Sequence, residues 1–170
     1  MRGSAIKLDL KVPVGALDRA VWLLLQRGGL WDQIGAEDHE RLAAQPAPFG
    51  SFFALLDHCM NDHGVLSRSG LLDWLRGASA QDGELTALLD RAAALHDLDD
   101  GVDALADLRT VLLRLQLEQV NGERSLLVGS GQLSGDALAR FNELGKRQSE
   151  LSAALAGGEA LPGRRPGRRL

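Results

Sequence analysis

The amino-acid sequence predicts an all-α protein, and three observations support this fold class. Leu and Ala dominate the apolar residues, aromatic residues make up only 4% of the chain, and Tyr is absent. These side chains lose little conformational freedom in a helix. Apolar residues recur at spacings of three and four, the period of an amphipathic helix, and Gly or Pro separates the periodic segments. The expected architecture is an N-terminal helical bundle whose long last helix leads into a C-terminal helical hairpin.

The chain is expected to start with a leader or linker over residues 1–14, because its weak alternation of apolar and polar residues ends at Pro13. The first helix is expected from Gly15 to the Gly28-Gly29 pair. One face of this helix collects the apolar residues Leu17, Ala20, Val21, Leu24 and Leu25. A short helical turn around Trp31 is expected to follow.

The segment 36–44 predicts a short helix, since its acidic residues come early, where they complement the helix dipole, and Pro46 follows. The run from Phe49 to Gly77 predicts two amphipathic helices that pack in the core. Gly64 is expected to end the first of them, and Ser67 to cap the second.

Leu85 to Leu95 predicts another amphipathic helix, and the longest helix of the chain is expected from about Gly101 to Val128. Its first half is apolar over a wide arc, whereas its second half carries few apolar residues and is expected to extend beyond the bundle. Gly122 is a candidate for a bend in this second half.

The last helix follows a short connection, with Ser134 as the expected N-cap. Its apolar residues alternate at spacings of four and three, which predicts the seam of a two-helix pair. The seam comprises Ala137, Phe141, Leu144, Gln148, Leu151 and Leu155. The predicted organisation is therefore a leader (1–14), a bundle (15–120), a hairpin (121–157) and a disordered basic tail (158–170), which is rich in Gly, Pro and Arg.

Charge and composition limit the classes of partner that we expect for this chain. The formal net charge is −4 although four arginines lie in the last seven residues, so the rest of the chain is more acidic still. Nucleic acid is therefore not expected as a main partner of the folded part. A single cysteine, Cys59, indicates a reducing compartment, for which the cytoplasm is the default. No apolar run approaches the roughly 20 residues that cross a bilayer, so no membrane partner is expected.

Two clusters resemble metal sites, but helix structure explains both of them better. The run from Asp97 to Leu108 has acids at odd spacings, yet its glycine comes too early for an EF-hand and Leu108 stands where the bidentate glutamate belongs. Helix capping by Asp99 or Asp100 is preferred. His58, Cys59 and His63 lack further ligands. Without a nucleophile triad or nucleotide motif, we expect no catalytic residues, metal or cofactor, and no enzyme activity.

The order and spacing of these elements resemble the C-terminal, helicase-binding domain of bacterial DNA primase of the DnaG type. The resemblance covers roughly residues 16–156. It is carried by ALDRAVWLLLQRGGLW in the first helix, by FFALLDHCMNDHGVLSRSGLLDWLRG in the central pair, and by LRTVLLRLQLEQ followed by LARFNELGKRQSEL in the terminal arm. It implies a helical bundle with a C-terminal hairpin, without the zinc-binding and RNA-polymerising domains of primase.

The resemblance implies a protein-interaction module of the primosome, in which the hairpin docks on the hexameric replicative helicase of the DnaB type and couples priming to unwinding in DNA replication. The module is expected to be a monomer alone. It further implies that Arg19 contacts the acidic C-terminal tail of single-stranded DNA-binding protein. The expected helicase-binding residues lie on the hairpin: Leu126, Leu127, Leu133, Phe141, Leu144, Gln148, Leu151, Ser152 and Leu155.

Two alternatives stay open. The N-terminal domain of a replicative helicase has a similar helical plan, and its tendency to form ring-building contacts would distinguish it from a monomeric primase module. A DNA-binding regulator could use Val65 to Gly77 as a helix-turn-helix. Its second helix, LLDWLRG, has few side chains suited to reading bases and stands in an acidic chain.

Overall fold

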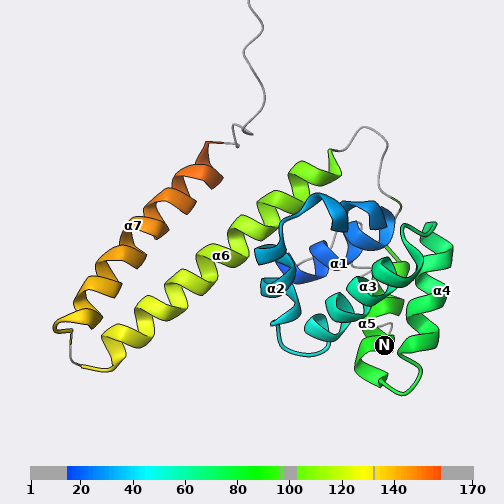
Figure 1. Ribbon diagram of the computed structural model, residues 1–170, viewed down its shortest axis with the longest axis horizontal. Coiled ribbons are helices and arrows are strands. Elements are labelled where there is room, and N and C mark those ends of the chain that lie inside the picture. Colours follow the sequence, from blue (N-terminus) through cyan, green and yellow to red (C-terminus); the bar gives the residue numbers. More distant parts are fainter. Residues whose placement is uncertain (1–14, 96, 98–102, 132, 158–170) are drawn as a thin grey trace, which may run out of the picture. The chain divides into compact units, whose positions relative to one another are not determined.

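A computed structural model describes residues 15–95, 97, 103–131 and 133–157. Every regular element in these ranges is a helix, which confirms the all-α class (Figure 1). The predicted leader and basic tail lie outside the described residues. The chain forms two compact units that divide between Val111 and Leu112. This division falls inside a long helix and earlier than the predicted one after residue 120, because Leu113 and Leu117 already pack in the hairpin.

The first unit is built around helix α1 (Ala16–Gln26), which contacts η1, α3, α4 and α5 (Figure 1). All residues from Ala20 to Leu25 are buried. A helix that is buried on every side lies in the middle of a bundle rather than on its surface. After α1, the 3₁₀ helix η1 (Gly28–Gln33) places Leu30 and Trp31 in the core.

Helices α2 (Ala36–Ala43) and α3 (Phe49–His63) pack against each other. The apolar stripe predicted on α3 is buried at Phe52, Phe53, Leu56 and Met60, so its role in the core is confirmed. The close approach of the two helices depends on Gly50. A Cβ atom at this position would lie 2.1 Å from the backbone oxygen of Gln45 and 2.8 Å from that of Ala43.

Local signals set the ends of the next helices. Gly64 ends α3 with a φ of 69°, a left-handed value that glycine adopts without strain. The Ser67 hydroxyl accepts a hydrogen bond from the Gly70 amide at 3.2 Å and caps α4 (Arg68–Ala78), as predicted. Gly77 lies inside α4 rather than closing it. Asp82 caps α5 (Gly83–Ala93) in the same way as Ser67, through the Leu85 amide.

Helix α6 (Ala104–Gly129) is helical without interruption through Gly122, and a bend at Gly122 stays a prediction. A carboxylate oxygen of Asp103 accepts a hydrogen bond from the Ala106 amide at 3.0 Å and caps its start. The predicted caps Asp99 and Asp100 lie outside the described residues. Helix α7 (Asp136–Ala156) starts after Gly135, whose φ is 55°, and the predicted cap by the Ser134 side chain is wrong because no side chain caps this helix.

Candidate protein-binding site

The second unit is an antiparallel pair formed by α7 and the part of α6 from Leu112 onward (Figure 1). Leu144 and Leu151 of α7 are buried together with Val120 of α6, and Leu113, Leu117 and Leu127 pack against them. The other predicted seam residues, which are Ala137, Phe141, Gln148 and Leu155, are partly buried, and most of their neighbours along α7 are exposed. The predicted seam is therefore the inner face of α7.

Polar side chains flank this apolar core. Arg140 donates to Glu123 at 2.9 Å, and Arg147 donates to Gln116 at 3.1 Å. These pairs cross from α7 to α6 in antiparallel register. Hydrogen bonds with Glu123, and then with Glu143, raise the pKa of Arg140 above its ordinary value. Exposed pairs of this kind contribute little stability, so the apolar seam is the main source of hairpin stability.

The closed end of the hairpin exposes a group of apolar side chains that we call the apolar tip: Leu126, Val128, Leu133 and Leu138. Their exposed fractions are 76%, 54%, 37% and 44%. They come from the last turns of α6, the connecting loop and the first turn of α7. Of the five large apolar side chains that are exposed in the described ranges, four belong to this one tip. Apolar groups gathered on a surface are typical of a protein-binding site.

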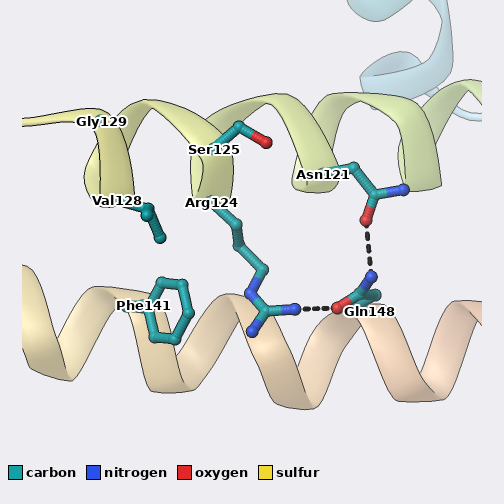
Figure 2. Close-up of a pocket in the computed structure, with 7 residues that line it drawn as sticks. All are labelled: Asn121, Arg124, Ser125, Val128, Gly129, Phe141 and Gln148. Atoms are coloured by element: carbon teal, nitrogen blue, oxygen red, sulfur yellow. Dashed lines mark hydrogen bonds between the residues drawn. The ribbon is translucent and has the colours of Figure 1, made fainter.

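A shallow hollow lies between α6 and α7 beside the apolar tip (Figure 2). Arg124 reaches from α6 toward α7, and its guanidinium carbon lies 4.4 Å from the ring centre of Phe141. The same guanidinium donates to the Gln148 carbonyl, and the Gln148 amide donates to Asn121 at 2.7 Å. The hollow is lined by Asn121, Arg124, Ser125, Val128, Gly129, Phe141 and Gln148.

The residues predicted to bind a helicase therefore divide into two groups. Leu126, Leu133 and Ser152 are exposed and available to a partner. The others are buried or partly buried, and the structure places two of them, Phe141 and Gln148, at the hollow. These seam residues are Leu127, Phe141, Leu144, Gln148, Leu151 and Leu155.

Val128, Leu138 and Arg124 are among the residues of this surface that the sequence prediction did not include. Val128 and Leu138 do not belong to the repeat of apolar residues at spacings of four and three along their helices. Apolar residues outside such a repeat and close to a loop are the sequence signal that could have identified them. Arg124 carries no such signal, because an arginine in a polar stretch of helix is ordinary. Its position against Phe141 depends on the pairing of the two helices.

In the first unit, Arg19 on α1 is already bound to Asp107, in the first turn of α6. Its Nε donates to Asp107 Oδ1 at 2.8 Å, and a second guanidinium nitrogen pairs with Oδ2. The hydrogen bonds that Arg19 donates to Asp107 raise the pKa of Arg19 above its ordinary value. The predicted contact of Arg19 with an acidic tail stays a prediction, and such a tail must compete with Asp107.

Cys59 and the histidines near it differ in exposure, since the thiol is buried and His58 and His63 are exposed. Cys59 is fully buried, and burial raises the pKa of its thiol above the ordinary value, with a smaller contribution from Asp62. His58 is exposed and lies 3.2 Å from a carboxylate oxygen of Asp62. His58 and His63 both approach the Trp74 ring, at 5.9 and 6.0 Å between ring centres.

The acids of the calcium-like segment serve other contacts. Asp97 pairs with Arg68, and Asp103 caps α6 as described above, whereas Asp99 lies outside the described residues. Across the part of the chain that the structure describes, no three His, Cys, Asp or Glu side chains come together as a possible metal site. The same residues include no helix with the length and apolar character needed to cross a membrane.

Comparison with known proteins does not identify the chain. No protein-family model, no curated protein and no solved structure matches it. The functional interpretation therefore depends on the apolar tip, on the hollow beside it and on the order of the helices.

Proposed function

We propose that the chain is a noncatalytic module of a bacterial primase that docks on the N-terminal domain of the hexameric replicative helicase. In this role it couples priming to unwinding during DNA replication in the cytoplasm. Two features support the proposal. The order of the helices is the one on which the sequence resemblance rests, and the hairpin that the resemblance assigns to docking carries the exposed apolar tip.

The apolar tip is the observation that carries this proposal. Full burial of one large apolar side chain contributes about 1.5 to 3 kcal/mol. Four fully exposed side chains would contribute roughly 6 to 12 kcal/mol, and the tip can contribute about half of this, because Val128, Leu133 and Leu138 are already partly covered. Association itself costs an estimated 4 to 15 kcal/mol, so the tip supplies an anchor and the surrounding polar residues must add to it.

Isothermal titration calorimetry with the N-terminal domain of the cognate helicase tests the proposal. The wild-type chain is expected to bind at micromolar concentration. Leu126→Ser removes the most exposed apolar side chain of the tip and should weaken binding about tenfold or more, which corresponds to about 1.4 kcal/mol.

Val65→Ser is the matched control, because Val65 is 59% exposed but lies in the first unit. This variant should bind like the wild type. Absence of binding by the wild-type chain, or equal weakening by the two substitutions, would contradict docking through the tip. Sedimentation of the chain alone should show a monomer, and a stable ring or dimer would favour a helicase domain instead.

A further inference from the structure

Arg124 stands apart from the other cations that join α6 and α7. Arg140 is paired with Glu123 and Glu143, and Arg147 with Glu150. Arg124 is partly buried, yet no carboxylate of the described residues lies within ion-pair distance of it. A cation withdrawn from water without a counter-charge is costly, so this arrangement indicates an anion supplied from elsewhere.

The hydrogen bonds of Arg124 support the same conclusion. A guanidinium has five N–H groups, and in this hairpin one nitrogen donates to Gln148. The Nε–H group is buried and has no acceptor among the described residues. A buried donor without a partner destabilises the fold, and such groups are uncommon in folded proteins. The Gln148 oxygen accepts from the terminal nitrogen Nη1 of Arg124 and not from Nε, and the Gln148 nitrogen donates to Asn121.

The residues that line the hollow indicate the chemical class of its ligand. Arg124 is the one charged residue that lines it, and Phe141 and Val128 supply apolar surface. Val128 belongs to the apolar tip as well, so the hollow and the tip share this side chain. A nucleic-acid backbone requires several cations in a row, which this hollow lacks. A single carboxylate that is flanked by apolar groups matches both its charge and its walls.

We propose that the hollow at Arg124 is a receptor for an aspartate or glutamate side chain of a partner protein, in a segment where apolar residues adjoin the acid. The carboxylate binds the guanidinium, and the apolar neighbours cover Val128 and the rest of the tip. The inference deepens the proposed docking function and depends on it for the identity of the partner. The carboxylate preference itself is testable without any helicase.

A matched pair of small probes tests the preference on the intact chain. N-acetyl-L-leucine carries a carboxylate beside an apolar side chain, and N-acetyl-L-leucinamide has the same shape without the charge. In NMR titrations we expect the acid to shift the Arg124 Nε–H signal and the Ser125 and Gly129 amide signals with saturation at millimolar concentration. A Kd of 1 mM corresponds to about −4 kcal/mol, which is reasonable for a probe of this size. The amide is expected to leave these signals unchanged.

Two variants localise the effect. Arg124→Gln should abolish the shifts caused by the acid, whereas Arg140→Gln should retain them because Arg140 does not line the hollow. Far-UV circular dichroism verifies that both variants keep their helices. If Arg124→Gln fails to fold, the comparison of N-acetyl-L-leucine with N-acetyl-L-leucinamide on the wild-type chain still tests the carboxylate preference.

Three outcomes overturn the proposal: no saturable shift with the acid, equal shifts with acid and amide, or a stronger response to inorganic phosphate than to the acid. The test also separates this inference from the docking function. If the acid binds but the helicase domain does not, the proposed partner is wrong and the carboxylate receptor stands. If the helicase domain binds while the acid does not, Arg124 serves only to pack against Phe141.

Discussion

Replacement of Gly50 by alanine tests the packing of the first unit. The added Cβ atom would lie 2.1 Å from the Gln45 backbone oxygen and 2.8 Å from that of Ala43. Both contacts are far shorter than van der Waals distance and involve backbone atoms, so the start of α3 must move away from the end of α2. Overpacking of this kind costs about 1 to 3 kcal/mol, whereas alanine gains at most about 1 kcal/mol over glycine in a helix.

Gly50→Ala is therefore expected to lower the free energy of unfolding by about 1 to 2 kcal/mol. Urea unfolding followed by circular dichroism measures this change as a lower midpoint at an unchanged slope. Gly77→Ala is the matched control in the same unit, since a Cβ atom there meets nothing within 4 Å. This control should be neutral or stabilising by up to about 1 kcal/mol. A Gly50→Ala variant at least as stable as Gly77→Ala would refute the packing described for α2 and α3.

Three further predictions concern helix ends, helix interiors and pH. Ser67→Ala removes the cap of α4 and should cost about 1 kcal/mol in urea unfolding, whereas the control Ser67→Asn keeps a capping side chain and should have little effect. Gly122→Ala should raise the thermal midpoint of the hairpin, by up to about 1 kcal/mol in stability, because α6 is regular there and nothing obstructs a Cβ atom; a lower midpoint would show that α6 needs a flexible residue. Burial raises the pKa of Cys59, so the unfolded chain loses this thiol proton first and stability should fall as the pH rises above about 8.5. A Cys59→Ala variant that shows the same fall would contradict this assignment.

Helix periods and local stop signals made much of the fold predictable from the sequence. The stripe on α3 and the seam on α7 are repeats of apolar residues along one helix, which need no knowledge of the partner surface. Gly64 and Ser67 act on their own backbone neighbourhood, and both predictions are confirmed. The prediction that Ser134 caps α7 is wrong, because Gly135 precedes the helix instead. Gly135 has a positive φ and not the extended conformation of a typical N-cap residue.

Features that depend on distant parts of the chain could not be predicted. Arg19 and Asp107 are 88 residues apart, and their pairing appears only when α1 and the first turn of α6 meet. Gly50 depends on nearby residues instead, but its contact with the backbone oxygens of Ala43 and Gln45 requires the folded turn between α2 and α3, which no residue pattern shows. Likewise, spacing predicted the inner face of α7, but the exposed tip and the position of Arg124 follow from how α6 and α7 pair.

The most direct test of the central claim is an NMR titration of the isotope-labelled chain with the N-terminal domain of the cognate helicase. The docking proposal predicts that signal changes concentrate between Arg124 and Leu138, which includes the hollow and the apolar tip. Signals of α3 and α4 should change little in the same experiment. Changes confined to the first unit, or no changes at a helicase concentration well above micromolar, would contradict the claim that this hairpin is the docking element.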